Sequence, residues 1–314
     1  MSYTQFGLIE ATDYNNLVGP PDETAANRLN TIWAASAASW GYGQSAVAQV
    51  VVGGTVTASN WATLVNTQAN IGAHQGTSLT PITAPSTGQT VTALTALPTN
   101  LSTLYTNRLN AASQGSTDSL SVTRSTGWST SLSFTNIIQF ANGDAARYFF
   151  NSGGQLAVTV SHPNGSGSDA LFNNLCGDCG TVVLSSPNGA TIAIAGTSYT
   201  GVTKIGGGGN PATVLTNNGY YALTVGANSI FTQTTDVGPY FNSFIQINAN
   251  SNGTQGSLSD RGNIITLVTS WVQSPSGSPV SAGSTTTVTI RPPSTTYIAN
   301  SWGTINLGGS VTGS

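Results

Sequence analysis

Two cysteines separated by two residues are the side chains best suited to chemistry in this chain. Cys176 and Cys179 have the Cys-x-x-Cys spacing that serves thiol redox chemistry or provides half of a zinc site. A structural zinc ion takes four ligands, and the sequence offers no further cysteine and only two histidines. We therefore expect no metal ion and no cofactor. We interpret residues 176–179 as a tight turn before a strand at 181–185, with thiols that are either free or locally bridged. Free thiols are favoured if the protein is assembled in a reducing cytoplasm.

Neither histidine is predicted to be a catalytic base, because we identify no constellation of partners around it. His74 lies where a helical pattern ends, and His162 ends a strand-like run before Pro163. The chain contains no Gly-x-Ser-x-Gly elbow, no His-Glu-x-x-His and no P-loop. The glycine run at 206–209 is not followed by Lys-Ser or Lys-Thr, so we interpret it as a flexible loop and not as a phosphate cradle.

The carboxylates do not predict a hydrolase. Cleavage of a glycosidic bond needs a pair of carboxyl groups, and the chain has ten acidic residues in all. We interpret those of residues 121–314 as turn residues, a common role of Asp; they are Asp144, Asp169, Asp178, Asp236 and Asp260, of which Asp144 and Asp178 lie beside Gly. We therefore expect no catalytic residue, and a glycan hydrolase is kept as an alternative.

The scarcity of charge limits the class of protein most strongly. Only 5% of the 314 residues are charged and the net charge is −3, whereas about 25% are charged in ordinary soluble domains. Disorder usually needs high net charge, and aromatic residues recur along the whole chain, so we expect a folded protein. Its surface should be polar but neutral, and such a surface favours association with copies of itself.

Composition also excludes some partners. Lys204 is the sole lysine, and no basic stripe is present that could neutralise the phosphates of a nucleic acid. Residues 1–7 lack the charged and apolar regions of a signal peptide. No stretch reaches the roughly 20 apolar residues of a membrane helix, so we expect no membrane insertion.

The pattern of residues 1–120 predicts helices, and that of residues 121–314 predicts short strands. The expected helices begin at Thr12 or Asp13, at 22–24 with an apolar stripe through Trp33, at Ser59 or Asn60, and at Leu97 or Pro98 with an end near Ala112. Residues 9–18 and 56–65 resemble each other, each with an apolar residue, a cap, an aromatic residue and Leu-Val. This similarity is either chance or a duplicated helical unit that builds a small pairing module.

Asn-Gly and related turn residues separate the expected strands. The strands are expected at 131–140, 155–161, 181–185, 191–195, 220–225, 229–235, 243–248, 263–272, 285–291 and 304–307, with a short crossover helix at 169–175. The predicted fold is therefore α+β, with a mainly helical region at 1–120 and an antiparallel β-sandwich or jelly roll at 121–314.

Arg147 precedes three consecutive aromatic residues, Tyr148, Phe149 and Phe150. Asp144 makes it a candidate ion pair in a chain with few charges. Three aromatic residues in a row cannot all face one core from a strand. Either one side of the strand contacts the helical region or a neighbouring subunit, or the strand is simply buried on both sides.

Several motifs together resemble virion structural proteins of tailed bacteriophages, especially marine and cyanobacterial phages. They are FGLIEATDYNNLVG at 6–19, LNTIW at 29–33, GYGQ at 41–44, VTASNW at 56–61, HQG at 74–76, ARYFFNSGG at 146–154 and GYYALT at 219–224. Ala34 departs from the Gly expected after the Trp, and the two cysteines are not expected in this class. The resemblance covers most of the chain and implies no catalytic residues.

The resemblance implies a non-enzymatic subunit of the tail, a fibre or the baseplate, assembled in the host cytoplasm and located in the virion. Its partners would be copies of itself and other virion proteins, with no nucleic acid. Two alternatives remain at this point. The chain is a receptor-binding adhesin whose aromatic residues stack on a host-surface glycan, or a capsid decoration protein.

Overall fold

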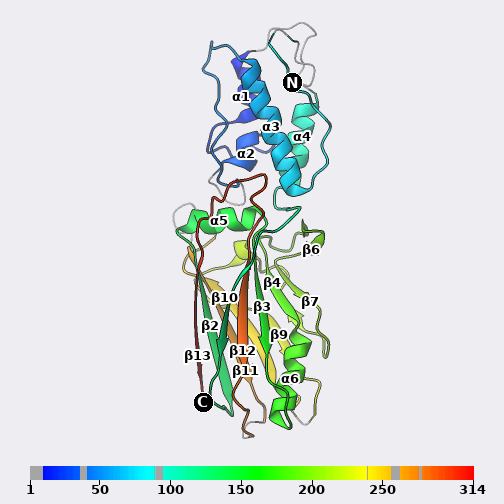
Figure 1. Ribbon diagram of the computed structural model, residues 1–314, viewed down its shortest axis with the longest axis vertical. Coiled ribbons are helices and arrows are strands. Elements are labelled where there is room, and N and C mark those ends of the chain that lie inside the picture. The colour runs from blue at the N-terminus through cyan, green and yellow to red at the C-terminus, as the bar shows by residue number, and fades with distance from the viewer. Residues whose placement is uncertain are drawn as a thin grey trace.

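The chain forms a helical region stacked on the end of two β-sheets. The structure is a computed structural model that describes residues 10–35, 41–87, 89, 95–238, 240–255, 262–275 and 278–314. Figure 1 shows the N-terminal helices at one end of a long molecule, the strands running roughly along its length, and the C-terminus at the far end. The α+β class predicted from the sequence is confirmed, with helices first and antiparallel strands after them.

The helical region consists of α1 (Ala11–Val18), α2 (Leu29–Trp33), α3 (Ala58–Gln75) and α4 (Ala96–Thr106). Helix α2 is shorter than predicted, because the stretch at 22–28 forms turns and not the first part of a helix. Helix α4 ends at Thr106 instead of near Ala112. The remaining chain between these helices is extended or irregular.

The two similar segments of the sequence form equivalent helix starts that contact each other. In α1 the backbone N–H of Glu10 donates to the Asp13 carboxylate (3.1 Å), and in α3 that of Thr57 donates to the Asn60 side chain (2.9 Å). Both caps lie earlier than predicted. The aromatic residues of the two segments, Tyr14 and Trp61, pack edge to face with centroids 5.5 Å apart. The repeated pattern therefore builds one paired unit inside a single chain.

Side-chain amides hold the irregular segments of this region in place. Asn15 bonds to both the N–H (2.8 Å) and the C=O (2.7 Å) of Val50. Asn30 does the same to Val47 at 3.0 Å on each side, and also donates to the Gly19 carbonyl (2.7 Å). An amide that pairs both backbone groups of one residue replaces the hydrogen bonds of a neighbouring strand.

The strands form two antiparallel sheets that enclose a common core. The five-stranded sheet has the order β1 (Asp118–Thr123), β12 (Thr285–Arg291), β3 (Gln155–Ser161), β4 (Thr181–Leu184), β7 (Val202–Ile205). The six-stranded sheet has the order β13 (Asn306–Gly313), β2 (Ser131–Gln139), β11 (Ile264–Val272), β10 (Phe244–Ser251), β9 (Asn228–Thr234), β8 (Thr213–Val214). A hairpin of β5 (Ile192–Ile194) and β6 (Thr197–Tyr199) packs on the outside of the five-stranded sheet, against Val183.

The core between the sheets is rich in aromatic residues. Trp271 of β11 is fully buried and contacts the rings of Phe134, Trp128 and Phe172. Phe172 belongs to α6 (Ser168–Cys179), so the predicted crossover helix is present and contributes to this core. Most predicted strands are also present, whereas β1, β6, β7 and β8 were not predicted.

Two predicted strands are wrong. The aromatic run belongs to helix α5 (Gly143–Asn151), which Asn142 caps by accepting from the Ala145 N–H (2.8 Å). Residues 220–225 contain a short 3-10 helix, η1 (Tyr220–Ala222), in which Tyr220 stacks on Phe150 with centroids 4.2 Å apart. Helix α5 lies across the end of the sandwich that faces the helical region (Figure 1).

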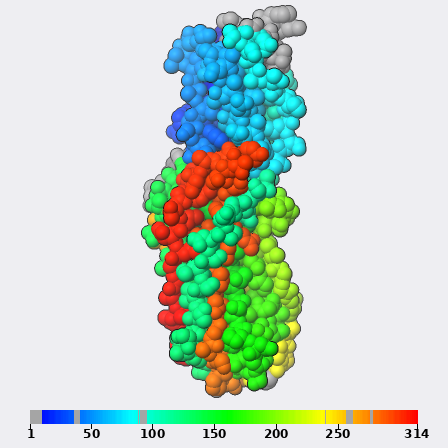
Figure 2. Space-filling model, in the orientation of Figure 1, coloured from blue at the N-terminus to red at the C-terminus, as the bar shows by residue number. Residues whose placement is uncertain are grey.

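The C-terminal segment, residues 292–314, runs over the surface and connects the helical region with the sandwich. Figure 2 shows it in red, crossing the surface between the helical region and the sandwich before it descends along the edge of the sheet. That descending part is β13, which pairs with β2 over its whole length. The chain therefore returns to the junction after the sandwich is otherwise complete.

We expect Asn30→Ala to lower the free energy of unfolding by about 2–3 kcal/mol, because it leaves buried backbone groups of Val47 and Gly19 without partners. Urea denaturation would measure the difference. Asn66→Ala is the matched control, since Asn66 lies exposed on α3 and alanine suits a helix. Equal stability of Asn30→Ala and the control would contradict this role of the amide.

Candidate functional site: the junction between helices and sandwich

The segment Gly41-Tyr42-Gly43-Gln44 lies where the helical region meets the sandwich. Gly41 (φ 76°) and Gly43 (φ 69°) have left-handed backbone conformations. A Cβ at Gly41 would collide with the Ala35 carbonyl, and one at Gly43 would collide with the Tyr148 ring of α5. Only glycine satisfies both the conformation and the space at these two positions.

Tyr42 is fully buried at the centre of this segment and is bonded in several directions. Its hydroxyl donates to the Arg108 carbonyl (2.8 Å) and accepts from the Gln75 amide (2.9 Å). Its backbone N–H donates to the Ile32 carbonyl (3.0 Å), and its carbonyl accepts from the Ser301 hydroxyl (2.5 Å). Burial raises the pKa of the phenol, so it stays protonated and able to donate.

Helix α5 connects the segment to the sandwich. Asn151 donates to the Gly41 carbonyl (3.0 Å) and accepts from the Tyr221 hydroxyl (2.6 Å). Arg147 is fully buried, lies 3.4 Å from the Asp144 carboxylate, and contacts the ring face of Tyr148 at 4.3 Å. The predicted ion pair is therefore present, and the aromatic run does contact the helical region, although from a helix and not from a strand.

The C-terminal segment closes the junction from the other side. Gln44 bonds to both the N–H (2.8 Å) and the C=O (2.9 Å) of Ala299. This is the same amide arrangement that Asn15 and Asn30 make inside the helical region. Segments about 255 positions apart in the chain are thus joined through one side chain.

His74 also belongs to the junction and not only to the end of a helix. Its Nε2 lies 3.1 Å from the Ser152 carbonyl at the end of α5, so the neutral ring donates there. Its ring packs edge to face with Tyr42 at 5.1 Å. Burial lowers the pKa of the imidazole to about 4, which keeps it neutral at pH 7.

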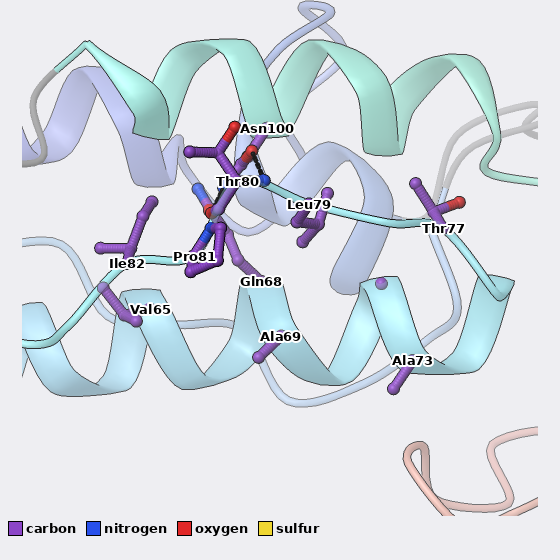
Figure 3. Close-up of a pocket in the computed structure, with 11 residues that line it drawn as sticks. Val65, Gln68, Ala69, Ala73, Thr77, Leu79, Thr80, Pro81, Ile82 and Asn100 are labelled. Atoms are coloured by element: carbon purple, nitrogen blue, oxygen red, sulfur yellow. Dashed lines mark hydrogen bonds between the residues drawn. The ribbon is translucent and has the colours of Figure 1, made fainter.

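A groove of about 420 Å³ runs beside the junction, between α3 and the extended segment at 77–82. Its lining is mostly small and apolar, and Figure 3 shows Ala69, Leu79 and Ile82 facing the space. The Asn100 amide at its edge is already bonded to both backbone groups of Thr80, at 3.0 Å each. The groove therefore offers apolar contact and no free charge to orient a ligand.

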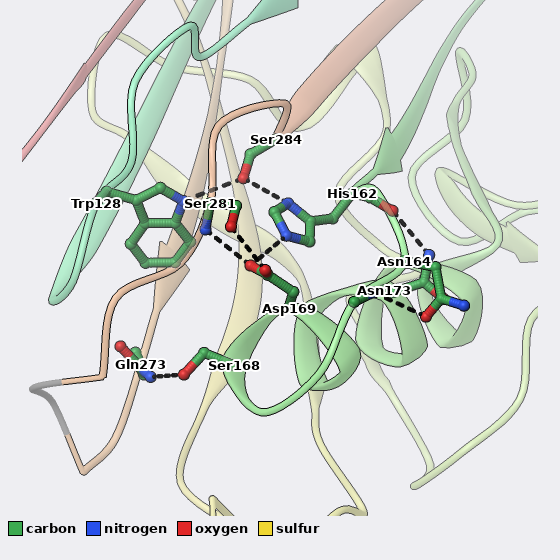
Figure 4. A network of polar contacts seen from close by, with 10 residues as sticks. Trp128, His162, Asn164, Ser168, Asp169, Asn173, Gln273, Ser281 and Ser284 are labelled. Atoms are coloured by element: carbon green, nitrogen blue, oxygen red, sulfur yellow. Dashed lines mark hydrogen bonds and ion pairs between the residues drawn. The ribbon is translucent and has the colours of Figure 1, made fainter.

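His162 has partners that the sequence analysis missed. Its Nε2 lies 3.0 Å from Asp169 Oδ1, and its Nδ1 lies 3.0 Å from Ser284 Oγ, as Figure 4 shows. Trp128 donates to the same Ser284 oxygen (3.1 Å), and the N–H and hydroxyl of Ser281 both donate to Asp169 at 2.7 Å. The expectation that His162 has no constellation was wrong.

This network has the connectivity of a Ser-His-Asp triad, but it lies inside the protein. Ser284 is fully buried, and its oxygen already accepts a hydrogen bond from Trp128, so no acyl group can reach it. Burial by itself would raise the pKa of Asp169, but the hydrogen bonds from Ser281 and His162 lower it overall. The network joins three segments: the residue after β3, the first turn of α6 and the loop before β12.

The cysteines lie in the last turn of α6 and not in a tight turn, which corrects the sequence interpretation. Both are free thiols, the favoured alternative, and both are buried. Burial raises the pKa of Cys179 to about 12 and also raises that of Cys176. The thiols are therefore protonated at neutral pH and are poor nucleophiles and metal ligands.

The glycine run at 206–209 packs closely over Asp178. A Cβ at Gly207 or Gly209 would collide with atoms of that residue, so lack of space accounts for these two glycines. Burial and the neighbouring Asp236 raise the pKa of Asp178, and Lys204 lowers it. With its amide oriented to suit both carboxylates, Asn174 donates to Asp236 (3.3 Å) and to Asp178 (3.2 Å).

We expect the stability of the junction to depend on pH through His74. Below pH 6.5 the unfolded chain binds a proton at this residue that the folded chain binds only near pH 4. Stability therefore falls as pH is lowered across this window, by at most about 1.4 kcal/mol per pH unit. His74→Gln should remove this contribution, whereas above pH 7 the wild type and the variant should show parallel curves. Urea midpoints measured from pH 4 to 8 would test this, and an identical slope in the variant would contradict it.

The remaining candidates add no catalytic arrangement. Asp260 lies outside the described residues. Among the described residues, no three His, Cys, Asp or Glu side chains are grouped closely enough to hold a metal ion. In the same part of the chain, no helix has the length and apolar character needed to cross a membrane.

Comparison of the chain with protein-family models, with curated proteins and with solved structures finds no match.

Proposed function

We propose that this chain is a non-enzymatic structural subunit of a tailed-phage virion, associated with the tail, a fibre or the baseplate. The junction is the observation that supports this most. Tyr42, Gln44 and Asn151 join the helical region, α5 and the C-terminal segment through buried hydrogen bonds. A chain joined in this way can carry a load from one end of a long molecule to the other.

The scarcity of charge also supports an assembled subunit. In solution such a surface gives little electrostatic repulsion between copies. Within an assembly the same surface can be buried without the cost of desolvating charges. The proposed partners are copies of the chain and other virion proteins, and the proposed location is the virion.

Mass spectrometry of purified particles, with imaging of the particle, tests this proposal. We expect the chain to be present at a fixed multiple of a known structural subunit and to appear as density of the size and elongated shape shown in Figure 1. A lysate protein of similar abundance that is not part of the particle serves as the control for contamination. Loss of the chain on washing, together with the absence of such density, would contradict the proposal.

A receptor-binding adhesin is the second candidate, and exposed aromatic side chains favour it. Phe241 is 63% exposed in the loop between β9 and β10. This loop lies beside the first residues of β10, at the end of the sandwich away from α5. A free aromatic face at a free end is suited to stacking on a sugar ring.

In this case we expect the full chain to bind a host-surface glycan on an array, and Phe241→Ala to lose most of that signal. Tyr297→Ala is the matched control, because Tyr297 is also exposed (45%) but lies in the C-terminal segment near the junction. Binding that is unchanged in Phe241→Ala would exclude this loop. Absence of binding to any host glycan would leave the architectural role.

A further inference from the structure

Among the described residues, no helix or strand covers one side of the six-stranded sheet. We call this side the outer face; it consists of the side chains that alternate with the buried core residues along β13, β2, β11 and β10. None of these strands contains Asp, Glu, Lys, Arg or His. Apart from five apolar residues, the positions of the outer face are Ser, Thr, Asn, Gln and Gly.

The apolar residues of the outer face are neighbours. Ile264, Val268 and Val272 recur at every fourth position of β11, so they lie on one side of the sheet. Phe244 lies directly opposite Val272 on β10. Ile137 of β2 is 40% exposed and lies opposite Thr266, diagonal to Ile264 and Val268. Together they form a stripe along the middle of the sheet.

Other described elements pack elsewhere. Helix α6 contacts the sheet from the core side, where Phe172 stacks on Trp271. The β5–β6 hairpin packs on the five-stranded sheet. The helical region lies beyond the end of the strands (Figure 1). The outer face therefore meets solvent in the described part of a single chain.

We propose that the outer face is the surface through which two copies of this chain associate, sheet against sheet. This deepens the proposed function, because it rests on a subunit that associates with itself. A face of this kind pairs with its own copy in a two-fold arrangement, in which each residue contacts the same patch on the partner. Sheets packed in this way lie about 10 Å apart, with their strands nearly aligned.

The size of the outer face is sufficient for such a contact. Its longest strands, β2 and β11, have nine residues each, so they extend about 30 Å, and adjacent strands lie about 4.8 Å apart. The four strands therefore cover roughly 600 Å² on each copy. This gives about 1,200 Å² in total, where specific interfaces begin.

The absence of charge favours a second copy over another partner. A charged partner surface would lose its hydration against the outer face and find no opposite charge there. The same face on a second copy brings hydroxyl and amide groups that both donate and accept, beside a matching apolar stripe. The face is thus complementary to itself.

Val268→Lys tests the proposal, because it places a charge at the middle of the stripe while the side chain can still reach solvent in the single chain. We expect the full-length wild type to associate in sedimentation equilibrium, and the dissociation constant to rise at least about tenfold in the variant. Val268→Thr keeps the shape without charge and should associate like the wild type. Thr159→Lys is the control on the five-stranded sheet, where Thr159 points away from the core.

Thr135→Lys is a second variant, which charges the outer face beside Val268 and leaves the apolar stripe intact. Unchanged melting temperatures establish that each variant is folded. A monomeric wild type, wild-type association in both outer-face variants, or equal weakening by Thr159→Lys would overturn the proposal.

Detection in particles is a separate measurement. A chain present in virions without outer-face contacts would refute only this inference, and a chain absent from virions that still dimerises through the face would refute only the proposed function.

Discussion

The structure depends on the way in which Tyr42 is buried between two parts of the chain. A phenol and a peptide group placed in a core must each find hydrogen-bond partners. Here those partners come from α2, α3, the chain after α4, and the C-terminal segment. The two glycines that flank Tyr42 let the backbone approach Ala35 and Tyr148 closely. The buried residues of the helical region and of the sandwich therefore form one continuous core.

Neutral polar groups perform in this chain the tasks that ion pairs often perform elsewhere. Four side-chain amides each pair both backbone groups of a distant residue, and they belong to Asn15, Asn30, Gln44 and Asn100. On the five-stranded sheet, three pairs of Ser and Thr hydroxyls bond across β1 and β12 at 2.7–2.9 Å. Such bonds are short in range and little affected by salt, unlike exposed charges. A low content of charge is thus compatible with a firmly joined fold.

Local patterns predicted the strands well and the junction poorly. Alternation and Asn-Gly turns locate β2, β11 and β12, because each of these strands buries one side. The aromatic run at 148–150 was assigned to a strand because short apolar runs do not distinguish a strand from a buried helix. Asn142 and Gly143 form one of the Asn-Gly pairs that indicate turns in the sequence, whereas Asn142 caps α5. The partners of His162 could not be predicted, since Ser284 lies 122 positions away and no local signal connects them.

The buried network of Ser284, His162 and Asp169 shows that accessibility, and not connectivity, decides what such residues can do. A hydrolase needs its hydroxyl at the surface of a cleft, with donors placed for the developing oxyanion. Here an indole N–H already occupies the hydroxyl oxygen, and the loop before β12 covers the carboxylate through Ser281. The polar groups that could do chemistry are used to join strand ends. The outer face of the six-stranded sheet is, by contrast, neutral and exposed in the described part of the chain, and the proposed role in assembly rests on such surfaces.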